Sequence, residues 1–307
     1  MRAVTPANPV AVAAAYAAVC VVWGSTYLFI KLGVAVLPPY LLGAARFTIA
    51  GAVMLAMALA TGRRIPRNRA VIGHAILVGI LLLVLGNGFL NTAQQHLSTG
   101  LAALLLTTVP MWNTLIAMLG HRHERLAPIG WVGLIVGLAG VAILVKPFES
   151  IESSWFGVIV VLLAAFSWSL GTVHARRRLA HVDALAVSAI ENGIAGPLMF
   201  GVHLVLERGQ PAVWNQQAWV SILYLALVGS LIGFTAFAFI TAHMSSSKVG
   251  TYTYVNPIVA IILGWWVLDE TLTWRLVLGG ATILAGLLLV YFSRVRQRHP
   301  RLAPEAS

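Results

Sequence analysis

The side chains best suited to chemistry in this sequence are three amides within one apolar stretch. Asn87, Asn91 and Gln94 follow one another at spacings of four and three residues, which places them on one face of a helix. Because an amide both donates and accepts hydrogen bonds, this face could bind a polar small molecule. Asn and Gln side chains also join packed membrane helices to one another, and that alternative stays open.

A second set of candidates surrounds two prolines, Pro110 and Pro257. Trp112 follows the first proline, and Tyr252 and Asn256 precede the second. Proline lacks an amide proton and frees a carbonyl one turn earlier, so both helices should be kinked. Kinks at matching places suit a cavity wall or a hinge, although membrane helices also tolerate them as packing features. We expect the prolines at gating or hinge positions and the other three residues against a substrate.

Two tryptophans, Trp23 and Trp168, occupy matching places well inside their apolar runs. Interfacial belts account for tryptophans near the ends of membrane helices, not for those in the middle. The pair could form an aromatic floor for an apolar or cationic substrate, and plain core packing is the alternative. With the three amides, Trp112, Tyr252 and Asn256, the two tryptophans complete the expected substrate-binding set.

Arg46 and Glu191 are ionisable residues of opposite charge at matching positions in the two halves of the chain. Polar groups inside a membrane are costly and are functional candidates by default. If the fold brings these two side chains together, a charge pair reduces the cost of burying both. Glu191 alone could instead bind and release a proton.

Neither a catalytic acid pair nor a metal site is expected. Glu124 and Glu270 recur at matching places, but each stands just ahead of an apolar run, where a carboxylate caps helix amides. The histidines in the apolar runs are scattered without a metal-binding motif, and only His174 is kept as a cavity candidate. We therefore expect no catalytic residue, no metal and no cofactor.

The elements that position these side chains are apolar helices facing lipid. The chain has 307 residues, of which 59% are hydrophobic and only 9% charged, whereas soluble proteins are about a quarter charged. Its net charge of +11 comes from short basic clusters between apolar runs, which excludes a nucleic-acid partner. Ten runs reach spanning length, about 20 residues each. They are 11–36, 40–61, 71–95, 98–120, 127–145, 155–175, 183–206, 217–243, 247–268 and 274–293.

The sequence also repeats itself. When the two copies are aligned, Gly133 falls on Gly279, and the Leu-Ala-Gly that ends at Gly140 falls on the one that ends at Gly286. A shared pattern of this length indicates an internal duplication, so the ten runs divide into two sets of five. In an apolar chain, such a duplication favours a transporter built from two repeats.

An odd number of helices in each repeat means that the repeats enter the membrane from opposite faces. Basic residues gather in alternate connections and in the C-terminal tail, and positive charge marks the cytoplasmic side, so both termini are predicted to be cytoplasmic. The predicted fold is an all-α membrane protein of ten transmembrane helices, in two inverted five-helix repeats around a central cavity. The first repeat is 1–145, and the second, with a short basic tail, is 146–307.

Three features of the sequence occur in a fixed order. The motif Trp-Gly-Ser-Thr at 23–26 is followed by Lys31, then by Arg-Phe at 46–47, and the pattern Pro…Glu-x-Leu…Gly…Leu-Ala-Gly occurs twice. Together they resemble the EamA-type ten-helix permeases of the drug/metabolite transporter superfamily, over about residues 11–293. The sequence His-Arg-His at 121–123 departs from the family pattern.

This resemblance implies a basket of helices that moves small metabolites, often amino acids, across the membrane. We expect a secondary carrier in the bacterial inner membrane, an exporter or facilitator working by alternating access, and not an enzyme. Few basic residues lie at membrane depth, so the expected substrate is a small neutral, zwitterionic or aromatic metabolite. Ten helices are enough to enclose a cavity in one chain, so a monomer can function alone. The alternatives are an intramembrane lipid-modifying enzyme and a passive channel.

Overall fold

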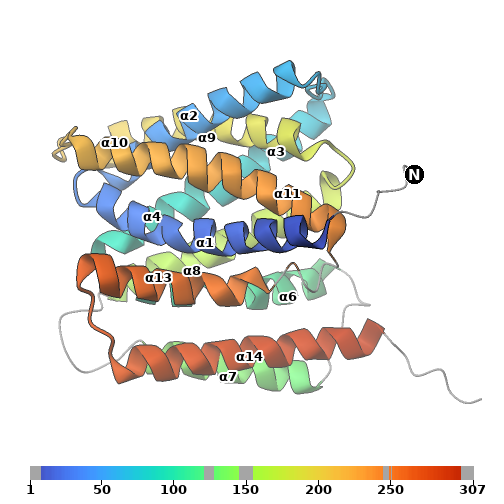
Figure 1. Cartoon of the computed structure of the whole chain (residues 1–307), viewed down its shortest axis with the longest axis vertical. Coiled ribbons are helices and arrows are strands. Elements are labelled where there is room, and N and C mark those ends of the chain that lie inside the picture. The colour runs from blue at the N-terminus through green and yellow to red at the C-terminus, as the bar shows by residue number, and fades with distance from the viewer. Residues whose placement is uncertain (1–7, 121–127, 145–154, 245–248, 250, 299–307) are drawn as a thin grey trace, which may run out of the picture.

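The computed structural model describes residues 8–120, 128–144, 155–244, 249 and 251–298, and within these ranges every element is helical (Figure 1). The symbol η marks a π-helical segment. The first half contains α1 (Pro9–Val34), α2 (Pro39–Ala60), α3 (Arg69–Gly79), η1 (Ile80–Asn87), α4 (Gly88–His96), α5 (Thr99–Leu106), α6 (Val109–Gly120) and α7 (Pro128–Leu144). The second half contains α8 (Trp155–Arg178), α9 (Ala184–Leu206), α10 (Gln216–Leu223), η2 (Tyr224–Ile232), α11 (Gly233–His243), α13 (Tyr252–Leu268) and α14 (Trp274–Arg298).

The helices follow the apolar runs of the sequence. Seven helical segments are long and apolar enough to cross a membrane, and α7, α13 and the apolar part of α14 are shorter. Polar side chains mark several starts, since Asn68, Asp183 and Asn215 each accept a hydrogen bond from a first-turn amide. Every expected run contains one helix or a consecutive series of them. The predicted all-α membrane protein is confirmed, whereas ten crossings stay a prediction.

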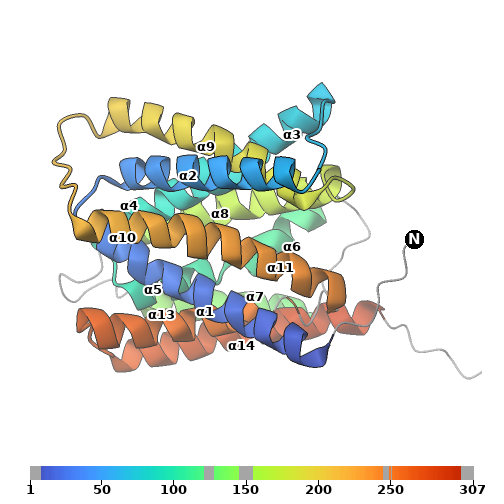
Figure 2. The same ribbon diagram turned by 45° about the horizontal axis from the view of Figure 1, so that its top comes forward.

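Helices α2 and α9 pack as a pair (Figure 2). The contacts of their side chains at both ends show that the pair is antiparallel. At one end the Glu207 carboxylate accepts hydrogen bonds from the Tyr40 amide at 2.9 and 3.2 Å. At the other end Arg63 forms an ion pair with Asp183, the N-cap residue of α9. Between the two ends, a Cβ on Gly51 would come within 2.7 Å of the α9 backbone. Glycine is therefore required where the two helices cross.

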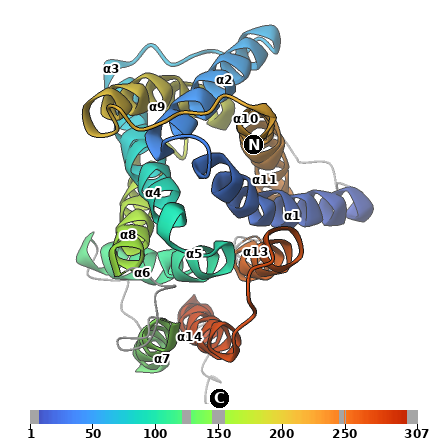
Figure 3. The same ribbon diagram turned by 90° about the vertical axis from the view of Figure 1, so that its left-hand side faces the viewer.

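Helices α7 and α14 pack through facing glycines, beside the row formed by α6, α5 and α13 (Figure 3). Gly133 lies against the carbonyl of Gly286, and Gly140 lies against that of Gly279. A Cβ on Gly286 would come within 2.5 Å of the Gly137 amide nitrogen. Small residues allow membrane helices to approach this closely, and here both helices supply them.

The other helices pack in pairs that correspond between the two halves of the chain. Helix α1 contacts α11 and α13, and α8 correspondingly contacts α4 and α6. Helix α2 contacts η2, and α9 contacts η1. Helix α5 lies among them against α13 and α8, and its side chains Leu104 and Leu105 are at most 1% exposed.

Candidate functional site

Two of the long helical segments are interrupted by a π-helix. Segment η1 lies between α3 and α4, and η2 lies between α10 and α11. A π-helix has i→i+5 hydrogen bonds, is rare, and is frequent at functional sites. Side chains bind carbonyls in the wider turns: Asn87 Nδ2 donates to Leu82 O, and Ser230 Oγ donates to Leu225 O, each at 3.1 Å. The sequence predicted neither interruption.

Each π-helical segment has a tryptophan packed against a glycine. The Trp23 indole nitrogen donates to the Gly229 carbonyl at 3.1 Å, and the ring also lies against Gly233. The Trp168 ring lies against Gly86, where a Cβ would be only 3.2 Å from the ring. Each π-helical segment is therefore contacted by a tryptophan from the other half of the chain, with a hydrogen bond for Trp23 and a ring contact for Trp168.

Arg46 reaches from α2 to both π-helical segments. Its Nη1 donates to the Asn87 Oδ1 at 3.3 Å, and its Cζ lies 4.7 Å from the centre of the Phe47 ring. Its Nη2 lies 3.8 Å from the place that a Cβ of Gly229 would take. The residue is 8% exposed, and its buried Nε has no hydrogen-bond partner among the described residues. We call Arg46, Asn87, Gly229 and Trp23 the central site.

Arg46 and Glu191 form no ion pair within the part of the chain that the structure describes. Arg46 stands five residues before Gly51, and Glu191 stands two residues before Gly193. Gly51 and Gly193 meet where α2 and α9 cross. Because the helices are antiparallel, these offsets add to about 10 Å along the helix axis at 1.5 Å per residue. The structure therefore separates the two side chains, and a proton role for Glu191 stays a prediction.

The other two amides of the expected polar face are also buried. Asn91 Nδ2 donates to the Pro39 carbonyl at 3.0 Å, which joins α4 to the start of α2. Its Oδ1 has no partner among the described residues, and neither has the side-chain nitrogen or oxygen of Gln94, which is 0% exposed. Asn91 thus contributes to packing, whereas the Gln94 amide keeps its hydrogen-bonding capacity.

Tyr252 and Asn256 line the junction between α13 and α1. The Tyr252 ring meets the Trp23 ring edge to face, with 5.1 Å between centroids. When the Asn256 amide is turned so that its nitrogen faces acceptors, this nitrogen donates to the carbonyls of Cys20 and Tyr252 at 3.2 and 3.1 Å. Tyr252 therefore belongs to the aromatic surroundings of Trp23, and Asn256 holds α13 against α1.

Trp112 and the two prolines complete the predicted set. Trp112 meets Phe166 of α8 edge to face at 5.3 Å. Helix α5 ends at Leu106 and α6 begins at Val109, just before Pro110, so the helical segment is interrupted there. Helix α13, in contrast, runs through Pro257 without a break. The two prolines are therefore not equivalent in local structure, and their hinge role stays a prediction.

Two charged side chains fix helix ends at one side of the bundle. Lys31 Nζ donates to the carbonyls of Gln94 and Leu97 at 2.7 and 2.8 Å, where α4 ends. The Glu270 carboxylate accepts hydrogen bonds from the first two amides of α5, at 2.7 and 3.4 Å. We call Lys31 and Glu270, with the α4–α5 corner that they hold, the outer clamp. The side is the one predicted to face away from the cytoplasm.

The prediction that Glu270 caps the helix that follows it is wrong, because its carboxylate caps α5 instead of α14. The preceding residue, Asp269, has a left-handed backbone (φ 53°) and turns the chain back toward α5. Glu124, its counterpart in the duplication, lies outside the described residues. A sequence pattern identifies a carboxylate near a helix start, but it does not say which helix the carboxylate will meet.

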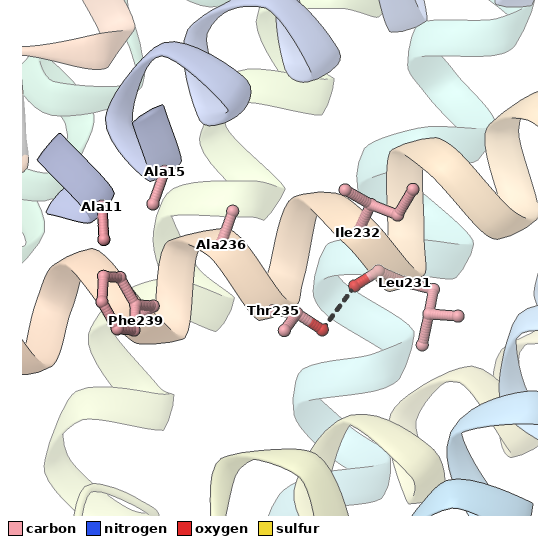
Figure 4. A pocket seen from close by; sticks show the side chains of 7 residues that line it. All are labelled: Ala11, Ala15, Leu231, Ile232, Thr235, Ala236 and Phe239. Atoms are coloured by element: carbon pink, nitrogen blue, oxygen red, sulfur yellow. Dashed lines mark hydrogen bonds between the residues drawn. The ribbon is translucent and has the colours of Figure 1, made fainter. Parts of the chain in front are cut away.

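Two further features lie apart from the central site. A groove of about 440 Å³ runs between the start of α1 and the η2–α11 segment, lined by apolar side chains and Thr235 (Figure 4). The Thr235 hydroxyl is already bonded to the Leu231 carbonyl at 2.8 Å. His174 lies 3.1 Å from His74, nitrogen to nitrogen. Groups of three or more metal-ligating side chains are absent from the described residues.

The sequence matches the EamA-like transporter family over residues 11–146 and 155–292. It is 33% identical over 258 residues to the uncharacterized inner membrane transporter YedA of Escherichia coli strain K12, covering 83% of this chain and 82% of that protein. It is 24% identical over 282 residues to the uncharacterized transporter YoaV of Bacillus subtilis strain 168, covering 91% of this chain and 96% of that protein.

A solved crystal structure shares the fold, with a TM-score of 0.66 and 22% identity, over 95% of this chain and all of that one. The apolar helices and these relatives make the chain an integral, multi-pass membrane protein, and the Escherichia coli relative agrees with the predicted inner membrane. The resemblance seen in the sequence is thus confirmed, and the chain belongs to the EamA-like transporter family.

Proposed function

We propose that this protein is a secondary carrier that moves small neutral, zwitterionic or aromatic metabolites, such as amino acids, by alternating access. One observation supports this more than any other. Two π-interrupted segments, one from each half of the chain, meet a buried arginine that binds one of them and lies against the other. Carriers with broken helices place substrate near such interruptions, at the interface of two repeats.

The inverted arrangement of the repeats is part of this proposal. The glycines that correspond in the duplication exchange their contacts, since Gly133 meets Gly286 while its counterpart Gly279 meets Gly140. A two-fold axis between α7 and α14 produces this exchange, and it also relates α1–α11 contacts to α8–α4 contacts. With five helices in each repeat, that axis would lie in the membrane plane, as in many carriers.

Exposed tryptophans support the same orientation. Six of the seven exposed tryptophans occur at the start of α8, before and within α10, at the end of α13 and at the start of α14. In the proposed topology all of these positions face away from the cytoplasm, where an interfacial belt of aromatic rings is common. These six are Trp155, Trp214, Trp219, Trp265, Trp266 and Trp274, whereas the seventh, Trp131, lies near the start of α7, on the side proposed to be cytoplasmic.

The outer clamp indicates where the bundle would open. Lys31 and Glu270 come from α1 and the end of α13, which pack together, and both hold the corner between α4 and α5. Opening the central site to the outside would separate these two groups of helices and break the clamp. Opening to the cytoplasm would leave the clamp closed. Alternating access then consists of the helix pair α1–α13 moving against α4–α5.

Transport by the purified protein in liposomes tests this proposal. We expect saturable uptake of one or more compounds from a panel of amino acids, and faster uptake when unlabelled substrate is loaded inside (counterflow). Each compound is measured with and without a proton gradient, because Glu191 is a candidate proton site. Non-saturable flux without counterflow would indicate a channel instead. No flux in this panel or in broader metabolite panels would contradict the carrier proposal.

A further inference from the structure

The Arg46 guanidinium has more hydrogen-bond donors than the protein uses. A guanidinium carries five N–H groups, and the hydrogen bond found for Arg46 joins Nη1 to Asn87. The Nε is buried without a partner among the described residues, although the side chain is only 8% exposed. A buried charge without partners is costly. The unused N–H groups of Arg46 are therefore available to a ligand.

The described residues provide no carboxylate for this guanidinium. The ion pairs found there are Arg63 with Asp183 and His203 with Glu207, both at the ends of α9. Glu191 lies beyond the α2–α9 crossing, about 10 Å along the axis by the spacing given above. Asn87, which does contact Arg46, is neutral and holds the guanidinium through one oxygen. The positive charge is therefore held in place by the fold without a carboxylate partner among the described residues.

We propose that Arg46 binds the carboxylate of the transported molecule, so that the substrate is a carboxylate-bearing metabolite, with amino acids as the class that best fits. This inference rests on the proposed carrier function and narrows it. The planar fork of arginine binds a carboxylate through two parallel hydrogen bonds. Nε and Nη2 form no hydrogen bond with the described residues. Their N–H groups lie side by side on one edge of the guanidinium, where they can bind the two oxygens of a carboxylate.

The surroundings of Arg46 suit the rest of such a molecule. The place that a Cβ of Gly229 would take lies 3.8 Å from Nη2 and 3.1 Å from the methyl carbon of Thr26. Trp23 adjoins the same glycine through its carbonyl. In the proposed arrangement the carboxylate meets the guanidinium, and the rest of the molecule lies on the side of Gly229 and Trp23. A phosphate dianion is a poorer fit, because it favours several convergent cations.

Matched substrates test the proposal on the full-length protein in liposomes. L-amino acids are compared with their α-carboxamides and methyl esters, which keep the side chain and the ammonium group but lack the carboxylate. We expect the acids to be transported or to compete at least about tenfold better, since one charge-assisted pair contributes this much. Equal transport of acids and amides by the natural protein would overturn the carboxylate site while leaving the carrier function intact.

Variants then assign the preference to Arg46. Arg46→Gln should bring the acid-to-amide ratio close to one, and Arg46→Lys should leave an intermediate ratio. Arg64→Gln is the control, since it removes an exposed positive charge from the connection after α2 and should leave the ratio unchanged. An Arg46→Gln protein that still prefers acids tenfold would contradict the proposal. If neither Arg46 variant folds, the ratio measured for the natural protein decides.

The same experiment distinguishes failure of the carrier proposal from failure of the carboxylate site at Arg46. Absence of saturable flux for acids, amides and esters alike, and for the broader metabolite panels, would contradict the carrier function itself, and the carboxylate site with it. Flux of amides and esters without preference for acids would contradict only the assignment of Arg46. The two failures are therefore distinguishable in one set of liposomes.

Discussion

Buried polar side chains in this protein mostly bind backbone atoms that helix interruptions and helix ends expose. Asn87 and Ser230 bind carbonyls within the π-helical turns, and Lys31 binds carbonyls where α4 ends. Gln94 differs, because its side-chain nitrogen and oxygen are both buried without a partner among the described residues. Arg46 and Gln94 thus belong to a set of buried polar side chains with unpaired atoms, which also includes Asn91, Thr99, Asn113, Asn192 and Ser221.

The ion pair between Arg63 and Asp183 should make stability depend on pH at one end of α2 and α9. Burial raises the pKa of the Asp183 carboxyl, but hydrogen bonds from the Ala186 amide and the Arg63 guanidinium lower this pKa by more than burial raises it. The pKa therefore lies below its ordinary value. A lowered pKa stabilises the folded state above the ordinary aspartate pKa of about 3.9 and loses this effect as the pH falls through the folded-state pKa.

Asp183→Asn isolates this charge, since Asn remains a good N-cap residue. We expect the variant to unfold at a lower temperature than the natural protein at pH 7, with the difference shrinking as the pH falls below about 4. Thermal unfolding in one detergent at several pH values measures this. A difference that is the same at every pH would show that the carboxylate charge does not stabilise the fold.

The sequence predicted the type of several important residues but not their partners. Trp23 and Trp168 were expected at matching places, and the fold packs each against a π-helical segment. Arg46 and Glu191 also match in sequence, yet the antiparallel crossing of α2 and α9 separates them. Glu270 caps α5 because Asp269 reverses the chain. The spacing of residues along one helix can be read from the sequence. Contacts between helices depend on where the helices cross, and a local sequence pattern does not reveal this.

At the scale of the helices, the apolar runs predicted approximately where each helical segment begins and ends, because length and hydropathy decide which segments can span a membrane. The π-helical segments could not be predicted in this way. Residues 80–87 and 224–232 are as apolar as their neighbours and contain no proline. Their wider turns depend on side chains such as Asn87 and Ser230 and on tryptophans from other helices, and so on tertiary packing.

Close packing of α7 and α14 should make their glycines intolerant of larger side chains. Gly286→Val would place side-chain atoms where even a Cβ is 2.5 Å from the Gly137 nitrogen, which forces the two helices apart. We expect a loss of about 1–3 kcal/mol of stability, as is typical of overpacking. Thermal unfolding in detergent measures the change.

Gly201→Val is the matched control, because a Cβ at Gly201 of α9 meets nothing within 4 Å. We expect this control to unfold within a few tenths of a kcal/mol of the natural protein, as surface changes usually do. Equal effects of the two valine substitutions would show that the α7–α14 contact is not as close as described.

At the scale of the whole molecule, the outer clamp should control opening of the bundle. Glu270→Gln replaces a carboxylate that accepts two amide hydrogen bonds at the start of α5. We expect the amides of residues 99–101 to exchange hydrogen with water at least several-fold faster in this variant, because opening becomes easier. Hydrogen exchange measured by mass spectrometry reports this.

Glu207→Gln provides the comparison, because Glu207 makes the equivalent contact with the Tyr40 amide at the start of α2. We expect faster exchange near residues 40–42 in that variant and unchanged exchange at 99–101. Unchanged exchange at residues 99–101 in Glu270→Gln would mean that the clamp does not hold the α4–α5 corner closed.

The central claim is that both sides of the membrane gain access, in turn, to a single site between the two π-helical segments. A cysteine at Thr26, beside Gly229, tests this most directly in a Cys20→Ser background, where it is the one thiol. We expect a membrane-impermeant thiol reagent to label this cysteine both in right-side-out and in inverted vesicles, and a transported amino acid to slow labelling from either side. Labelling from one side only, or labelling that the transported amino acid leaves unchanged, would contradict the account.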